Sequence, residues 1–159
     1  MDFKTFLMMC EAVEIRHIDP EEDWEDASKA EAIATISGIR TGRDKEPRII
    51  AYDENGEVVG AAFTSVATDS EFSSHYGEPV HRYEFDVVVH PKARGSDLVG
   101  IKLIRAAEAD KSDFEAAMGK TFSRLWVINP QLAKLLQTKR FGYEAESEYK
   151  DGTAHLLKW

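Results

Sequence analysis

Residues 83–108 read YEFDVVVHPKARGSDLVGIKLIRAAE. The first seven are rich in valine and aromatic residues and predict a buried strand from Tyr83 to Val89. After a turn with proline and glycine, apolar residues recur at helical spacing and predict an amphipathic helix that begins at Asp97 or Leu98. The first N–H groups of such a helix have no partner within it and lie at the positive end of its dipole. The stretch therefore predicts a phosphate site where the turn enters the helix.

The length and composition of the chain indicate one soluble domain. It has 159 residues, of which 43% are hydrophobic and 31% are charged. No apolar run approaches the roughly 20 residues that a membrane-spanning helix needs. Since no basic cluster followed by an apolar core opens the sequence, we expect a cytoplasmic protein without a secretory signal.

Charge and cysteine content argue against several classes of function. The net charge of -9 disfavours binding to nucleic acid or to anionic membranes, because both depend on Lys and Arg to neutralise phosphate. The single cysteine, Cys10, excludes a disulfide framework and a multi-cysteine zinc site, and its apolar neighbours favour a buried, inert thiol. The acidic run EEDWED, residues 21–26, could attract a cationic substrate, but such runs are more often the solvated face of a helix.

Apolar periodicity and turn signals divide the rest of the chain into strands and helices. The predicted strands cover residues 13–18, 48–52, 58–67, 82–89, 121–128, 143–149 and 154–159. The predicted helices cover residues 21–36, the segment from 98 to about 118 and the segment between Asn129 and Gly142, after a helical extension over residues 1–12. Asn55-Gly56 and Asp151-Gly152 predict the tight turns of two hairpins. The order β-α-β-β-β-α-β-α-β-β predicts one α+β domain over residues 1–159, a sheet with helices over it.

This order, with the Arg-Gly turn after the strand that ends at Val89, resembles the GNAT superfamily of acyl-CoA-dependent N-acetyltransferases over roughly residues 13–159. The resemblance implies a mixed, largely antiparallel central sheet flanked by helices. It also implies that this strand presents backbone groups to the pantetheine arm of coenzyme A, and that amides of the following turn bind its diphosphate. The residues at those positions are Val87, Val88, Val89, Arg94, Gly95, Ser96, Asp97, Leu98, Val99 and Gly100.

The turn departs from the family pattern of Arg or Gln, x, x, Gly, x, Gly or Ala. Asp97 and Val99 stand where small residues would be, and Gly100 falls one position late. Glycine lets the backbone approach a phosphate closely, whereas Asp97 would place a carboxylate near a diphosphate. Alternatively, Asp97 or Ser96 caps the helix, and a shift of one residue brings Gly100 into place. The sequence is compatible with a working acyl-CoA site and with a fold that has lost it.

A second part of the resemblance lies in WVINPQLAKLLQTKRFGY, residues 126–143. It implies a strand that ends at Asn129 and splays from its neighbour, so that the cofactor arm enters the opening. Asn129 is therefore a further candidate cofactor-binding residue. Many family members carry a tyrosine as general acid four residues before the glycine that corresponds to Gly142, but Thr138 occupies that place here. The hydroxyl acids left are Tyr76, Tyr143 and Tyr149, each of them more often a packing residue.

Acetyl transfer to an amine requires a base that removes a proton from the amine and groups that polarise the thioester carbonyl. The resemblance points to the fourth strand for the base, here Glu84, with Asp86 and His81 as second choices. Glu84 and Asp86 share one face of the strand, and two carboxylates within ~7 Å would raise each other's pKa. The other interpretation is that this face is simply solvated. The five histidines show no close ligand spacing, so we expect no metal site.

The leading interpretation is an N-acetyltransferase that moves an acetyl group from acetyl-CoA to a primary amine of a small molecule or a protein by direct transfer. One alternative is a non-catalytic GNAT-like binding protein with a lost or altered coenzyme A site. Another is an unrelated α+β module that binds a different phosphate-bearing ligand at the same turn. We expect acceptor recognition in residues 38–47 and 68–79, and no nucleic-acid or membrane partner. A homodimer is one of the assemblies that the sequence allows.

Overall fold

The computed structural model describes residues 2, 13–39, 41, 45–69, 80–96, 98–119 and 124–157. Predictions on the amino-terminal helix with Cys10, on the loop of residues 70–79 and on Asp97 lie outside these residues. Within them the elements follow one another as β-α-β-β-β-α-β-α-β-β, as predicted, with a short 3-10 helix before the second long helix. The α+β class and the largely antiparallel sheet are therefore confirmed.

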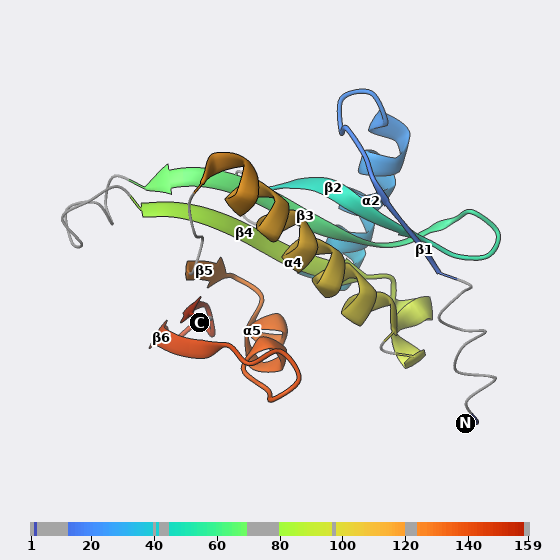
Figure 1. The fold of residues 1–159 in the computed structure, drawn as a ribbon. Coiled ribbons are helices and arrows are strands. Elements are labelled where there is room, and N and C mark those ends of the chain that lie inside the picture. Colours follow the sequence, from blue (N-terminus) through green and yellow to red (C-terminus); the bar gives the residue numbers. More distant parts are fainter. Residues whose placement is uncertain are drawn as a thin grey trace.

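Four antiparallel strands form the first sheet, in the order β1-β2-β3-β4. They are β1 (Glu14–His17), β2 (Glu46–Tyr52), β3 (Val58–Asp69) and β4 (Val80–Val89). Figure 1 shows β3 and β4 as a long pair that runs through the centre of the molecule. The predicted strands agree with these four except for one or two residues at their ends, where strand assignment is least determined by side-chain pattern.

A tight turn joins β2 to β3, as Asn55-Gly56 predicts. Gly56 has a φ of 76°, in the left-handed region that favours glycine. Asp53 Oδ1 accepts hydrogen bonds from the backbone N–H groups of Asn55, at 2.9 Å, and of Glu57, at 3.0 Å. This turn fixes the register in which Ala51 pairs with Gly60, and a side chain at Gly60 would collide with the Val88 carbonyl.

Three shorter antiparallel strands form the second sheet, in the order β5-β7-β6. They are β5 (Arg124–Val127), β6 (Glu144–Glu148) and β7 (Ala154–Leu157). Gly152, with a φ of 85°, makes the predicted turn between β6 and β7. In the part of the chain that the structure describes, β4 and β5 belong to separate sheets, so the strand pairing is interrupted between them.

The helices are α2 (Trp24–Ser37), α4 (Leu98–Met118) and α5 (Pro130–Leu136), with the 3-10 helix η1 (Pro91–Ser96) before α4. The predicted start of α2 at Glu21 is wrong, because Asp19 Oδ1 accepts the Glu21 N–H at 3.0 Å and holds the chain in a turn up to Asp23. The predicted ends of α2 at Gly38 and of α4 at Gly119 are confirmed.

The prediction that α5 continues to Gly142 is wrong, since the helix ends at Leu136. The N–H groups of Phe141 and Gly142 both bond to the Thr138 carbonyl, and the Tyr143 N–H bonds to the Leu136 carbonyl. This turn places Phe141 and Tyr143 in the core, where they are buried. Burial of two aromatic side chains outweighs the few helical hydrogen bonds that continuation of α5 would add.

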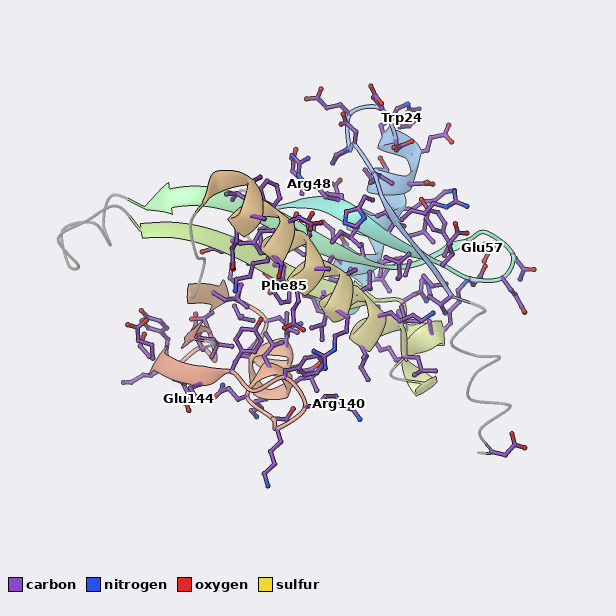
Figure 2. The ribbon with its side chains drawn as sticks, in the orientation of Figure 1. Trp24, Arg48, Glu57, Phe85, Arg140 and Glu144 are labelled. Atoms are coloured by element: carbon purple, nitrogen blue, oxygen red, sulfur yellow. The ribbon has the colours of Figure 1, made fainter. Side chains whose placement is uncertain are left out.

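The two faces of the first sheet are covered by different helices. Alternate residues of β4, among them Phe85, pack under α4, while Val88 packs with α2 on the opposite face. Figure 2 shows Phe85 enclosed between β4 and α4, with Trp24 and Glu57 projecting outward. The acidic run that precedes and opens α2 is largely exposed, which confirms the solvated interpretation of residues 21–26. No helix within the described ranges is both long and apolar enough to cross a membrane.

Candidate functional site

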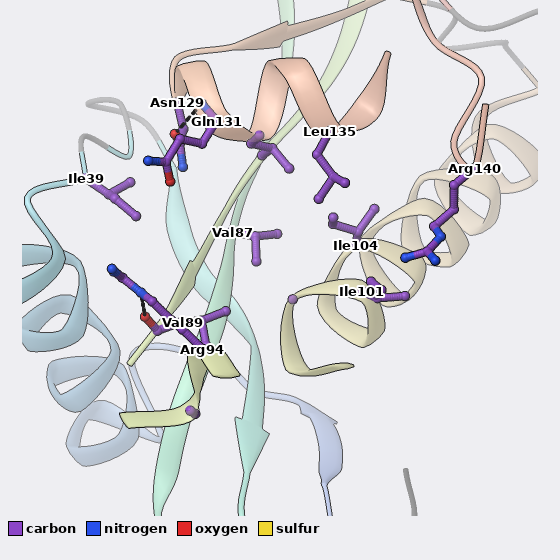
Figure 3. A pocket seen from close by; sticks show the side chains of 13 residues that line it. Ile39, Val87, Val89, Arg94, Ile101, Ile104, Asn129, Gln131, Leu135 and Arg140 are labelled. Carbon is purple, nitrogen blue, oxygen red and sulfur yellow. Dashed lines mark hydrogen bonds between the residues drawn. The ribbon is translucent and has the colours of Figure 1, made fainter. Parts of the chain in front are cut away.

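The gap in strand pairing between β4 and β5 opens into a cavity of about 310 Å³. Its wall comes from the end of β4, the first turns of α4 and one side of α5 (Figure 3). Most of the lining is apolar and consists of Ile39, Val87, Val89, Ala93, Ile101, Ile104, Leu132 and Leu135. The opening that the resemblance implies at the end of the strand before Asn129 is therefore present in the fold.

The backbone of β4 offers polar groups to this cavity. The His90 N–H donates to the Val59 carbonyl of β3 at 2.8 Å. In an antiparallel pair the residues that bond to the neighbouring strand alternate, so the N–H and C=O groups of Val87 and Val89 point away from β3. Arg94 Nε donates to the Val89 carbonyl at 3.0 Å, which agrees with that direction.

Of the three valines predicted to meet a cofactor, two line the cavity and one does not. The side chains of Val87 and Val89 lie in the lining, whereas Val88 is fully buried on the opposite face of the sheet. A period of two along a strand accounts for this division.

The turn after β4 folds as the 3-10 helix η1, and α4 begins at Leu98. Arg94 in this turn is exposed and lines the cavity. Val99 is directed into the core, since it is only 3% exposed and lies against Gly60. Gly100 lines the cavity instead, and a Cβ added there would lie 3.7 Å from Val89 Cγ2, an ordinary contact distance. The late glycine of the predicted motif thus faces the cavity, while Gly95, Ser96 and Asp97 have no described side chains.

The two predicted carboxylates of β4 are buried, so the interpretation of a solvated face is wrong. Glu84 is 6% exposed and Asp86 is 0% exposed. Asp86 Oδ2 accepts a hydrogen bond from Lys45 Nζ at 2.5 Å, and both side chains of this ion pair are buried. Asp86 Oδ1 accepts the Asn129 N–H at 3.3 Å. Asp86 therefore connects β4 to the segment after β5 at the point where the two sheets separate.

Burial raises the pKa of Asp86 above its ordinary value. The Lys45 ammonium and the backbone N–H groups of Asn129 and Ile128 act in the opposite direction without cancelling this effect. Lys45 could not be found from the sequence, because a single lysine in a polar loop has no pattern that distinguishes a buried side chain from a solvated one.

Neither Glu84 nor Asp86 lines the cavity, although Asp86 contacts the lining residue Asn129. A proton could therefore pass from a bound amine to either carboxylate only through an intervening group such as water. The backbone of His81 belongs to β4, nearer its amino end, and its side chain is outside the described residues.

Asn129 begins α5 and is shared by two cavities. Its side-chain oxygen accepts the Gln131 N–H at 3.0 Å, which caps the helix, and Pro130 occupies the first helical position. A second cavity of about 410 Å³ adjoins the first. Residues that line both are Ile39, Arg94, Asn129 and Gln131. The second cavity is more polar and also contains Ser37, Gly38, Ile128, Pro130 and Asp151.

No tyrosine among the described residues lines either cavity. Tyr143 is buried and its hydroxyl donates to Glu108 Oε2 at 3.4 Å, whereas Tyr149 is exposed. Thr138, at the place of the family's tyrosine, is exposed and donates to the Leu135 carbonyl at 2.7 Å. Within the described ranges, no three His, Cys, Asp or Glu side chains are grouped as a metal site.

Comparison with solved structures identifies the fold. The chain is 13% identical to a GNAT-family acetyltransferase from Streptococcus pneumoniae, with a TM-score of 0.56 over 92% of this chain and 98% of the other. It is 17% identical to yncA of Salmonella typhimurium, solved with its cofactor acetyl-CoA, with a TM-score of 0.54 over 92% of each chain. It is 12% identical to a mutant agmatine N-acetyltransferase in its apo form, with a TM-score of 0.58 over 92% of this chain and 98% of the other.

No family model matches the sequence, and no curated protein matches it. The structural likeness at these identities establishes a GNAT fold. It leaves activity and substrate to be argued from the residues of this chain.

Proposed function

We propose that this chain, which has the fold of the GNAT acetyltransferases, moves an acetyl group from acetyl-CoA to a primary amine of a small molecule or a protein. The observation that carries the proposal is the pair of adjoining cavities at the separation of β4 from β5. One is mostly apolar and the other is polar, and they share a wall that includes Asn129 and Arg94. Direct transfer requires two such sites, because the thioester and the amine must meet in one complex.

The first cavity suits the pantetheine arm of acetyl-CoA. The arm is a chain with amide groups, and the apolar lining can bury its methylene groups while the outward polar groups of Val87 and Val89 bond to its amides. The N–H groups of this strand end can also polarise the thioester carbonyl. The solved structure of yncA with acetyl-CoA supports the choice of cofactor by analogy of fold.

The acceptor amine would enter through the second cavity and attack the thioester carbonyl carbon. The new carbon–nitrogen bond forms as the carbon–sulfur bond breaks, and coenzyme A leaves as a thiolate that takes up a proton. Following the resemblance, we assign the base to Glu84, acting through water. Both oxygens of Asp86 accept hydrogen bonds, from Lys45 and from the Asn129 N–H. Asp86 then has a structural role, because it holds Lys45 and the Asn129 N–H next to the site.

Calorimetric titration of coenzyme A and acetyl-CoA into the protein and into the variant Gly100→Leu tests the proposal. The larger side chain would extend toward Val89 and fill the first cavity. We expect it to weaken binding about ten- to a hundredfold, equivalent to about 1.4–2.8 kcal/mol. The matched control is Ala109→Leu, at an exposed position of the same helix outside both cavities.

The two variants separate loss of the site from loss of the fold. Because leucine is a better helix former than glycine, Gly100→Leu should not lower the melting temperature. Absence of heat with both ligands at millimolar concentration in the unmodified protein would refute an acetyl-CoA site. Binding without acetylation of any of a panel of primary amines would favour the non-catalytic alternative.

A further inference from the structure

The charged residues that line the first cavity are positive, opposite in sign to the net charge of the chain. The chain has a net charge of -9. Among the described residues that line the cavity, however, the charged side chains are Arg94 and Arg140, both cations. An acidic protein that places two arginines on one cavity provides a site for an anionic ligand, since guanidinium groups bond strongly to phosphate oxygens.

The two arginines lie at opposite ends of the cavity. Figure 3 shows Arg94 beside Ile39 and Val89, and Arg140 at the far end beside Ile101. Arg94 also lines the second cavity, whereas Arg140 does not. Arg94 is therefore at the junction of the cavities, where the acetyl group must meet its acceptor. Arg140 is at the end where the rest of the cofactor must lie.

Their side chains also differ in what they already contact. Arg94 Nε donates to the Val89 carbonyl, which holds part of its guanidinium against the end of β4. Within the described part of the chain, the Arg140 guanidinium makes no hydrogen bond or ion pair. Its backbone is fixed, because Arg105 Nη2 donates to the Arg140 carbonyl at 3.2 Å and the Arg105 guanidinium stacks on the Phe141 ring at 4.5 Å.

We propose that Arg140 binds a phosphate group of the nucleotide end of coenzyme A. This inference rests on the proposed function and deepens it. The turn after β4 lacks the small residues that would let its amides approach the diphosphate at the usual positions, and it contains Asp97. A cation from the segment after α5 adds positive charge at the end of the cavity away from Arg94. Arg140, rather than Arg94, is then the side chain that selects a phosphorylated cosubstrate.

The test compares three ligands by calorimetry: coenzyme A, its 3′-dephospho form and pantetheine, which has no phosphate. The variant is Arg140→Gln, with Arg140→Lys as the conservative change and Lys139→Gln as the matched control. Lys139 is the exposed cation next to Arg140 and does not line the cavity. We expect Arg140→Gln to weaken coenzyme A binding by about tenfold or more, because charge-assisted hydrogen bonds are lost. Arg140→Lys should recover part of the affinity, and Lys139→Gln should bind as the unmodified protein does.

The ligand series identifies the contact. If Arg140→Gln weakens coenzyme A but not the dephospho form, the contact is to the 3′-phosphate; if it weakens both equally, the contact is to the diphosphate. Either result supports the inference when pantetheine binding is unchanged. Coenzyme A binding that is unaltered in Arg140→Gln, or a pantetheine loss equal to that of coenzyme A, would overturn it while leaving the proposed function intact. Failure of the unmodified protein to bind coenzyme A would overturn both.

Discussion

At the scale of single residues, the proposed mechanism depends on which carboxylate of β4 accepts the proton from the amine. Glu84 and Asp86 share a strand face and both are buried, but Asp86 is held by Lys45 and by the Asn129 amide. A carboxylate with both oxygens engaged in structural contacts is poorly placed to receive a proton from a substrate. These contacts favour a structural role for Asp86.

Glu84→Gln should lower the turnover of acetyl transfer by about 10²–10⁴-fold, the usual contribution of a general base. Its affinity for acetyl-CoA should change little, because Glu84 does not line the cavities. The measurement is the steady-state release of coenzyme A in the presence of an amine that the unmodified enzyme acetylates, together with calorimetry for cofactor binding. Turnover equal to that of the unmodified enzyme would remove Glu84 from the mechanism.

At the scale of elements, the alternation of residues along β4 determines which side chains pack under α4 or line the first cavity and which pack with α2. From Tyr83 to Val89, its odd-numbered side chains pack under α4 or line the first cavity, and Val88 packs with α2. In the hydrogen-bonding direction, the even-numbered residues bond to β3 and the odd-numbered backbone groups face the opening. Since β5 belongs to the other sheet, the end of β4 behaves as an edge inside the molecule.

Hydrogen exchange can test this alternation. In the free protein, the amides of Val87 and Val89 should exchange faster than the amide of Val88, because the latter bonds to β3. Saturation with coenzyme A should slow Val87 and Val89, and leave Val88 little changed. Exchange measured residue by residue by NMR gives the comparison. Equal rates at the three valines in the free protein would contradict the proposed direction of the backbone groups.

At the scale of the whole molecule, Asp86 and Lys45 join parts that the sheets leave separate. The ion pair connects the segment before β2 to β4, and the Asn129 N–H connects both to the start of α5. A buried charge that loses its partner is costly, whereas removal of both charges is tolerated far better. We therefore expect loss of one partner to weaken the connection between the two sheets by more than the net contribution of the pair to stability would suggest.

Lys45→Met should lower the free energy of unfolding by about 3–5 kcal/mol, since Asp86 would remain buried without its cation. The double variant Lys45→Met with Asp86→Asn removes both charges and keeps an oxygen for the Asn129 N–H, so it should recover much of this loss. Urea unfolding followed by tryptophan fluorescence provides the values, with Lys139→Met at an exposed site as the control. A Lys45→Met protein within about 0.5 kcal/mol of the unmodified one would show that the ion pair holds nothing together.

Much of the architecture was determined by the sequence alone, through effects that act over a few residues. Asn55-Gly56 specifies a turn because glycine accepts a positive φ, and the apolar spacing after Leu98 specifies a helix with one buried face. Their order along the chain, together with the Arg-Gly turn after Val89, resembles the GNAT superfamily and so implied its fold. The resemblance indicated Val87, Val89 and Gly100 as cofactor-binding residues, and these three do meet at one cavity.

Only the tertiary structure decided which distant residues share a site. Lys45 meets Asp86 across 41 positions, and Arg140 comes to the far end of the cavity because α5 stops at Leu136 and Phe141 enters the core. No periodicity encodes such contacts, since they depend on how the elements pack together. The burial of Glu84 and Asp86 is likewise a result of packing, and for Asp86 it includes the contact with Lys45 from the segment before β2. Packing, rather than pattern, formed two adjoining cavities beside the predicted phosphate turn, with an arginine at each end of the first cavity.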